Sequence, residues 1–264
     1  MKLGLIGAGN MARAIIGGVV KQGSYKGEDL LVSRRQQEAL EKLREAYGCG
    51  ITTDNVRVAA ETDILFLAVK PQMLPGVIAE IKDVVRQEQV IVSIAAGKTL
   101  DWLTEAFGRN VKLVRCMPNT PALAGEGCTA VCANALTSEE ELERITQIFE
   151  SCGRAVRLPE SLMDAFGALA GSSPAYVFML IEAMADGAVA GGIPRAQAYG
   201  IAAQTVLGSA RLLLETGEHP GVLKDMVCSP GGTTIRGLQI LEREGMRAAV
   251  MQALEACIQR SKEL

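Results

Sequence analysis

The chain has 264 residues, of which 48% are hydrophobic and 22% charged, an ordinary globular composition with enough length to bury a substantial core. A net charge of -3 and an aromatic content of 4% offer neither the positive field nor the stacking side chains of a nucleic-acid-binding protein. Seven cysteines without a Cys-x-x-Cys pair, a single histidine and an N-terminus without a signal-peptide pattern predict no metal site, reduced thiols and a cytoplasmic location.

A nucleotide-binding motif stands at the very start of the chain. Residues 3–6 predict an apolar strand, residues 7–12 read GAGNMA, and a helical pattern continues through Val19. This G-x-G-x-x-A spacing between a strand and a helix is typical of dinucleotide-binding folds. Gly7 permits the tight turn, Gly9 lets the backbone approach a pyrophosphate, and the helix N-terminus offers N–H donors to the anion. An ordinary strand–helix turn can have the same spacing, so the elements that follow matter.

Strands and helices alternate through the rest of the first half. We expect strands at residues 30–32, 64–69, 90–94, 111–116, 129–132 and 155–158. We expect helices at residues 36–47, 75–85, 100–107 and 138–151. Continuous apolar strands separated by helices predict an α/β Rossmann-like domain over residues 1–158, with a parallel sheet covered on both faces.

The end of the second strand suggests which dinucleotide is bound. An NAD site usually has an acidic residue here, but this chain has Ser33, Arg34 and Arg35. A hydroxyl and two guanidiniums suit a 2′-phosphate, so we expect NADPH as the cofactor, with NADH accepted as well. The alternative is a solvated pair of arginines at the start of a surface helix.

Three further loops follow predicted strands, at residues 68–71, 94–97 and 117–121. In open α/β sheets ligands bind at the carboxyl ends of the strands, so these loops and the glycine turn are expected to form one cleft. In the third loop two prolines predict a rigid backbone, with the amide of Asn119 and the hydroxyl of Thr120 available to a ligand.

The second half, residues 159–264, is predicted to be an all-α domain. Helices are expected at residues 160–170, 174–190, 194–215, 222–227, 234–244 and 246–262. The apolar stretch from Phe166 to Ile193 contains Glu182 and Asp186, which favours buried core helices over a membrane span. So much apolar surface on few helices predicts that another subunit covers part of it.

This half contains few groups for acid–base chemistry. After Pro159 the candidates are His219, in a turn, and Lys224, beside Asp225, since Lys262 lies in the tail. A ketone reductase must protonate the forming alkoxide, usually with Lys, His or Tyr. A protonated imine already carries the charge that attracts a hydride, so its reduction needs no such acid and can depend on positioning.

The stretch CSPGGTTIRG, residues 228–237, predicts a turn followed by a helix that begins at Thr233 or Thr234. A helix N-terminus behind two glycines exposes backbone N–H groups that can bind a substrate carboxylate. The alternative is a plain loop in which a threonine hydroxyl caps the helix.

These residues resemble the pyrroline-5-carboxylate reductase family over nearly the whole chain. The most specific match runs from Leu223 to Ile235 and continues through Leu241-Glu242 to Met246-Arg247. Supporting matches are residues 6–11, 68–71, 115–121 and 171–176. The resemblance implies NAD(P)H-dependent reduction of 1-pyrroline-5-carboxylate to L-proline, the last step of proline biosynthesis. It also implies a homodimer formed through the C-terminal helices, which can assemble into a larger homo-oligomer.

The motifs and the resemblance together assign the site residues. The expected cofactor-binding residues are Ile6, Gly7, Ala8, Gly9, Asn10, Met11, Ser33, Arg34, Asn55, Ala68, Val69, Lys70, Pro71, Ala95, Ala96 and Gly97. The expected substrate-binding residues are Ser229, Gly231, Gly232, Thr233 and Thr234, with Thr234 as the catalytic residue.

Two alternative functions stay open at this point. A β-hydroxyacid dehydrogenase would share the two-domain plan but needs a catalytic lysine in the helical half, where lysines are scarce. A non-catalytic NADP-sensing protein would not need the substrate loop at residues 229–234. Neither alternative involves a membrane or a nucleic acid.

Overall fold

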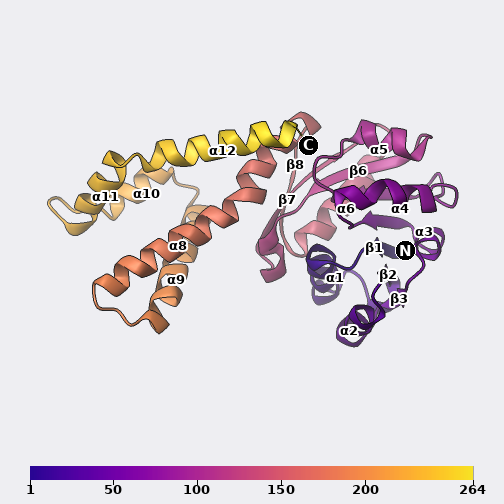
Figure 1. Ribbon diagram of the computed structural model, residues 1–264, viewed down its shortest axis with the longest axis horizontal. Helices are drawn as coiled ribbons and strands as arrows, with labels where there is room; N and C mark the ends of the chain where they lie inside the picture. Colours follow the sequence, from indigo (N-terminus) through magenta and orange to yellow (C-terminus); the bar gives the residue numbers. More distant parts are fainter. Residues whose placement is uncertain (264) are drawn as a thin grey trace. The chain divides into compact units, whose positions relative to one another are not determined.

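The computed structural model describes residues 1–263 and divides the chain into two compact units (Figure 1). The first unit comprises residues 1–171 together with the segment that starts at Ile258, and the second comprises Ser172–Cys257. The expected domain border at residue 158 lies directly after the last strand, which ends at Arg157. The compact units instead divide after Gly171, because a short helical segment packs with the sheet.

An eight-stranded sheet forms the centre of the first unit. Its strands are β1 (Leu3–Ile6), β2 (Leu30–Ser33), β3 (Gly50–Thr52), β4 (Ile64–Leu67), β5 (Val90–Ser93), β6 (Lys112–Met117), β7 (Gly127–Ala133) and β8 (Gly153–Arg157). The strand order is β3-β2-β1-β4-β5-β6-β7-β8, and the first six strands are parallel in the order typical of dinucleotide-binding folds. The predicted Rossmann-like architecture is confirmed.

The sheet departs from the predicted all-parallel pattern at one strand pair. β7 runs antiparallel to β6, and β8 runs parallel to β7. Between β6 and β7 the chain makes only the short 3-10 turn η3 (Thr120–Ala124), without the crossover helix that a parallel neighbour requires. β3 was not among the predicted strands, because its three residues are only partly buried and give a weak apolar signal.

Six helices cover the two faces of the sheet (Figure 1); five were expected, and the helix at Asn55–Glu61 was not predicted. They are α1 (Asn10–Gln22), α2 (Gln37–Tyr47), α3 (Asn55–Glu61), α4 (Leu74–Ile81), α5 (Leu100–Phe107) and α6 (Glu139–Glu150). One buried cluster includes Ile15 of α1, Leu40 of α2 and Phe149 of α6. The other buried cluster includes residues of α3, α4 and α5. Alternate residues of the strands enter one cluster or the other, so the unit has a core on each side.

A helical segment after β8 completes the first unit. It consists of the 3-10 turn η4 (Glu160–Leu162), α7 (Met163–Phe166) and the π-helical turn η5 (Gly167–Ser172). Met163 and Phe166 are buried against the second core cluster. The Glu160 carboxylate lies 2.8 Å from the guanidinium of Arg115 on β6. These contacts explain why the first unit extends past the last strand.

The second unit contains α8 (Ser173–Ala190), α9 (Arg195–Thr216), α10 (Pro220–Met226), α11 (Thr233–Arg243) and most of α12 (Met246–Lys262). Its buried hydrophobic residues are Ala185, Ala198 and Ala202, where α8 and α9 pack closely. The expectation of buried core helices between residues 166 and 193 is therefore wrong for a single chain. Phe178 and Met179 on α8 are 63% and 68% exposed.

One continuous helical stretch among the described residues, Glu160–Ala190, has the length and composition to cross a membrane. Length and composition are weak evidence for one such helix, and Glu182 and Asp186 lie within it. Asp186 is paired with Arg195 at 2.6 Å, and its side chain is 60% exposed.

Candidate cofactor edge and substrate loop

The loops predicted to bind the cofactor lie side by side at the carboxyl edge of the sheet. The amide of Gly7 donates to the carbonyl of Ser33 at 3.0 Å. The amide of Ala68 donates to the carbonyl of Ile6 at 2.8 Å, and that of Ile94 donates to the carbonyl of Leu67 at 3.3 Å. The loops after β1, β2, β4 and β5 are thus fixed in register with one another, as the sequence analysis expected.

The glycine turn has the geometry of an anion-binding loop. Gly7 has φ +99°, and a Cβ atom there would lie 2.5 Å from the carbonyl oxygen of Ala68, so only glycine fits. A Cβ atom on Gly9 would meet nothing within 4 Å. Gly9 is also the N-cap of α1, which has no side-chain cap and no acidic residue in its first turn. The N–H groups that open α1 therefore have no side-chain cap, and these residues fit a dinucleotide pyrophosphate.

The end of β2 differs in detail from the expected 2′-phosphate site. Arg34 is partly buried, and its guanidinium donates to the carbonyl of Ala8 at 3.0 Å and to Gln36 Oε1 at 2.9 Å. Ser33 is fully buried, and its hydroxyl donates to Asn55 Oδ1 at 2.6 Å. Only Arg34 of these three residues presents a cation beside the glycine turn. Arg35 is exposed.

The two loops expected on the nicotinamide side are shaped differently. Lys70 is exposed and precedes the 3-10 turn η2 (Pro71–Met73). Ala95 is buried, whereas Ala96 is exposed at the end of β5. Just beyond this loop the Lys98 ammonium lies over the Trp102 ring, 4.8 Å from its centroid. This cation–π pair was not among the predicted site residues.

Asn119 is not available to a ligand, which corrects the expectation for the third loop. The residue is 8% exposed, and its Oδ1 accepts from the amide of Cys128 at 2.8 Å. Its Nδ2 donates to the carbonyl of Ala170 at 2.9 Å, in the π-helical turn η5. The amide group thus joins β7 to the helical segment. Its role is structural, and Thr120 alone remains exposed in this part of the loop.

The predicted substrate loop in the second unit is a tight turn followed by a helix. The amide of Gly232 donates to the carbonyl of Ser229 at 3.0 Å, and Gly231 has φ +72°. Proline followed by a glycine of positive φ is typical of a type II turn. Helix α11 begins at Thr233 with Gly232 as its N-cap, and no side chain caps it. The first-turn N–H groups are therefore not used by a threonine cap, and Thr234 is partly buried.

The acid–base candidates of the second unit are engaged elsewhere. His219 Nδ1 accepts from the amide of Gly221 at 3.1 Å and caps α10, as expected for a turn residue. Lys224 forms a hydrogen bond with Asp225 that raises the pKa of the lysine. The higher pKa favours the protonated form and makes Lys224 a weaker acid. The Tyr176 hydroxyl and the Cys257 thiol share a hydrogen bond at 2.9 Å, which raises the pKa of Tyr176. Within the described residues, no three metal-binding side chains gather into a site.

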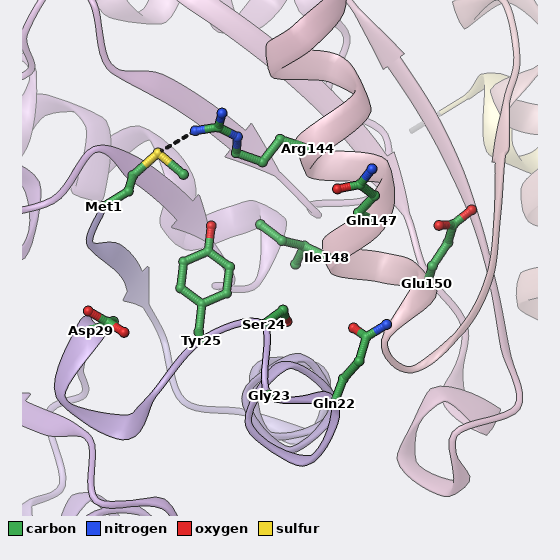
Figure 2. Close-up of a pocket in the computed structure, with 10 residues that line it drawn as sticks. All are labelled: Met1, Gln22, Gly23, Ser24, Tyr25, Asp29, Arg144, Gln147, Ile148 and Glu150. Atoms are coloured by element: carbon green, nitrogen blue, oxygen red, sulfur yellow. Dashed lines mark hydrogen bonds between the residues drawn. The ribbon is translucent and has the colours of Figure 1, made fainter.

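Two surface cavities in the first unit lie away from the cofactor loops. The larger, about 590 Å³, is lined by residues that precede β1 and β2 and by the end of α6 (Figure 2). Tyr25 and Arg144 contribute to its wall, and burial raises the pKa of Tyr25. The second cavity, about 450 Å³, lies between α1 and the η3 turn. The first opens at the amino edge of the sheet, opposite the glycine turn.

Comparison with known proteins identifies the family. Residues 160–264 match the family model described as pyrroline-5-carboxylate reductase dimerisation, and residues 2–97 match the model described as NADP oxidoreductase coenzyme F420-dependent. The chain is 47% identical to the pyrroline-5-carboxylate reductase of Escherichia coli (strain K12), over 100% of this chain and 98% of that protein. The chain belongs to the pyrroline-5-carboxylate reductase family.

Solved structures agree with this assignment. A pyrroline-5-carboxylate reductase from Coxiella burnetii has a TM-score of 0.94 and 34% identity, covering 99% of this chain and 97% of that one. The pyrroline carboxylate reductase of Plasmodium falciparum with NADP bound has a TM-score of 0.89 and 32% identity, covering 100% of this chain and 97% of that one. Membership of this reductase family, an NAD(P)-dependent oxidoreductase family, decides against the two alternative functions considered above.

Proposed function

We propose that this chain reduces 1-pyrroline-5-carboxylate to L-proline, with NADPH as the preferred reductant and NADH as a second one. The observation that carries the proposal is the 47% identity over the full chain with a pyrroline-5-carboxylate reductase. The turn and helix start at residues 229–234 support it, because they present backbone N–H groups without a competing side-chain cap. The reaction is the final step of proline biosynthesis, and we place the protein in the cytoplasm.

The cofactor is assigned to the carboxyl edge of the sheet in the first unit. A bound reduced nicotinamide supplies the hydride. Residues 6–11 would hold the pyrophosphate through the open N-terminus of α1, and Arg34 would meet the 2′-phosphate. Residues 68–71 and 95–97 would border the nicotinamide ring. In the relative from Plasmodium falciparum the bound cofactor is NADP.

The substrate is assigned to the loop that opens α11. Backbone N–H groups of Gly231, Gly232, Thr233 and Thr234 would bind the carboxylate, with Ser229 at the edge of the turn. The hydroxyl of Thr234 would orient the ring nitrogen. Since the protonated imine loses charge as it is reduced, this chain needs to hold and align it, not to supply a proton. The engagement of His219 and Lys224 in local hydrogen bonds is consistent with that division of roles.

Assembly is assigned to the second half of the chain. We propose a cofactor-binding domain at residues 1–158 and a substrate-binding and dimerisation domain at residues 159–264, with homodimers that can assemble further. The match of residues 160–264 to a dimerisation family supports this, as does the exposure of Phe178 and Met179 on α8. A second copy is the partner that would cover these side chains.

Turnover by the purified protein tests the proposal. The protein is mixed with 1-pyrroline-5-carboxylate and NADPH or NADH, and both oxidation of the reductant and formation of L-proline are followed. We expect stoichiometric proline and a lower KM for NADPH than for NADH. Oxidation of a β-hydroxyacid with no reduction of the imine would support the dehydrogenase alternative. Tight NADPH binding without turnover of either substrate would support a sensing role.

A further inference from the structure

Glu80 reaches the cofactor edge from a helix outside every motif of the family. It lies near the end of α4, which packs against α3, and it is exposed. Its Oε2 accepts from Asn55 Nδ2 at 2.9 Å, and Asn55 is the first residue of α3. Asn55 Oδ1 accepts from the Ser33 hydroxyl at 2.6 Å. Ser33, Asn55 and Glu80 therefore form a hydrogen-bond chain across the ends of three elements.

The direction of these bonds determines what Ser33 can offer a ligand. A serine hydroxyl has one proton, and in this chain the proton is donated to Asn55. Toward a ligand Ser33 thus keeps only acceptor lone pairs. These suit a ribose hydroxyl, which donates, but not phosphate oxygens, which accept. Because Ser33 is fully buried, a ligand would reach its oxygen only after the atoms that cover it moved.

Glu80 fixes that direction because a carboxylate only accepts hydrogen bonds. With Glu80 present, Nδ2 of Asn55 must face the carboxylate and Oδ1 must face Ser33. A flipped carboxamide would place Oδ1 against the carboxylate oxygen, and two acceptors repel. Without Glu80 the flip is free, Nδ2 can donate to Ser33 Oγ, and the serine proton becomes available to a phosphate.

We propose that Glu80 is a positioning residue that restrains selectivity for the 2′-phosphate of NADPH and so keeps NADH usable. The inference rests on the cofactor edge assigned under the proposed function. Glu80 acts through Asn55, because its carboxylate holds the carboxamide in the orientation that uses the Ser33 proton. Arg34, whose guanidinium donates to the carbonyl of Ala8, acts in the opposite sense.

The test measures binding of two cofactor fragments to the whole protein, separately from turnover. Calorimetry gives the Kd of 2′,5′-ADP and of 5′-AMP, and their ratio isolates the contribution of the 2′-phosphate. The variants are Glu80→Ala, Glu80→Gln and the same pair in an Asn55→Ala background. Asp83→Asn is the matched control, since it removes an exposed acid one turn beyond Glu80. The 5′-AMP affinity reports that the edge stays folded.

We expect Glu80→Ala to raise the preference for 2′,5′-ADP by about five- to tenfold, the effect of one gained hydrogen bond. Glu80→Gln should give part of that gain, because glutamine can accept from or donate to Asn55. Asp83→Asn should change the ratio less than about twofold, and so should loss of Glu80 when Asn55 is already alanine.

An unchanged or lowered preference in both Glu80 variants would overturn the inference. So would an equal gain in Asp83→Asn, which would reveal a general charge effect, or a full gain in the Asn55→Ala background. If the wild-type protein bound neither fragment, the assignment of the cofactor site to this edge would be wrong, and both proposals would fail. Normal fragment binding with no selectivity change would remove only the role of Glu80.

Discussion

The two units of the chain bury their hydrophobic side chains in different ways. In the first unit the sheet has a core on each face, closed by helices of the same chain. In Ser172–Cys257 only three alanines are buried, and large side chains such as Leu214 and Met251 are 72% and 69% exposed. The first unit has what it needs to fold by itself, whereas the second has an apolar surface that calls for a partner.

The two units also differ in the chemistry of their sites. The first presents a guanidinium, a buried hydroxyl and a carboxamide around the glycine turn, so charge and hydrogen-bond direction decide what binds. The loop at residues 229–234 presents backbone N–H groups and threonine hydroxyls with no charged side chain. Changes in the first unit should therefore alter the choice of cofactor, and changes in the loop should alter turnover.

The largest effect is expected from placing charged side chains on the apolar face of the second unit. Replacing Phe178 and Met179 together by Glu should prevent assembly, because each buried side chain is worth about 1.5–3 kcal/mol and each change occurs twice in a dimer. The total exceeds about 6 kcal/mol, so light scattering should show mostly monomers at micromolar concentration. Activity should be lost with the dimer.

Leu136→Glu is the matched control, since Leu136 is 48% exposed in the first unit and should not affect assembly. A wild-type protein that stays a 28.0 kDa monomer at micromolar concentration while fully active would show that the exposed face has another purpose. An unchanged assembly of the double variant would place the interface on other helices.

The sequence predicted the first unit well where structure is local, and less well where distant segments meet. Apolar runs and the glycine turn located most strands, because burial on both faces leaves a continuous signal. The reversal at β7 depends on a connection too short to cross over, which no single strand reveals. Asn119 looked like an available amide until its partners, Cys128 and Ala170, were known. Glu80 gave no signal, since an exposed acid on an amphipathic helix is commonplace.

In the second unit the sequence predicted the helices and the turn, with a helix start at Thr233 or Thr234, and α11 begins at Thr233. It predicted buried core helices over residues 166–193 with another subunit covering part of the apolar surface, and in the single chain only Ala185 of α8 is buried. Apolar composition shows that a surface must be covered, but periodicity cannot tell whether the cover is the same chain or another. The small residues of α8 and α9 do pack closely, yet they bury little beyond Ala185, Ala198 and Ala202.

Removing the two arginines after β2 is expected to give the second largest effect. Only Arg34 lies beside the glycine turn, and one lost charge-assisted hydrogen bond costs about 1.5–3 kcal/mol, so Arg34→Ala with Arg35→Ala should raise the KM for NADPH by roughly ten- to a hundredfold. The KM for NADH should change much less. Steady-state kinetics with both cofactors measures this, and Arg154→Ala, another exposed arginine of the first unit, serves as control. If the KM rose equally for NADPH and NADH, Arg34 and Arg35 would be surface residues with no part in recognising the 2′-phosphate.

A buried ion pair should matter for the stability of the first unit. Arg115 is 4% exposed and Glu160 is 29% exposed, and Arg115 Nε has no hydrogen-bond partner among the described residues. Glu160→Gln leaves the buried cation unpaired and should lower the free energy of unfolding by about 3 kcal/mol. Arg115→Met removes the buried charge itself and should cost less. Urea unfolding of both variants tests the order, and a larger cost for Arg115→Met would contradict it.

Buried thiols should make the first unit less stable at alkaline pH. Burial raises the pKa of Cys132 and Cys152 from 9.0 to about 11. Between these values the unfolded chain loses the protons and the folded chain keeps them, so the free energy of unfolding falls as pH rises from 9 to 11, by about 2 kcal/mol for each thiol and about 4 kcal/mol for the pair. Urea unfolding at several pH values should show a shallower decline in Cys132→Ala with Cys152→Ala than in wild type.

The smallest effect is expected at Thr234, where the comparison between the units is sharpest. If its hydroxyl orients the imine and the neighbouring N–H groups bind the carboxylate, Thr234→Ala should lower kcat/KM and leave NADPH binding intact. One neutral hydrogen bond is worth about 0.5–1.5 kcal/mol, so the loss should be about tenfold. Steady-state kinetics, with NADPH affinity measured separately, tests this. Thr216→Ala is the control, because that hydroxyl donates to the carbonyl of Leu212 within α9.

Two outcomes at Thr234 would revise the division between the units. A loss beyond about 10⁴-fold would have the size of a general acid's contribution, and Thr234 would then take part in proton transfer. No loss, with α11 still folded, would leave the backbone of the turn as the whole site or move the substrate elsewhere. A tenfold loss fits a protonated imine, because its positive charge already activates it toward hydride transfer. In that case the second unit supplies alignment, the first unit selects the source of the hydride, and neither has to supply an acid.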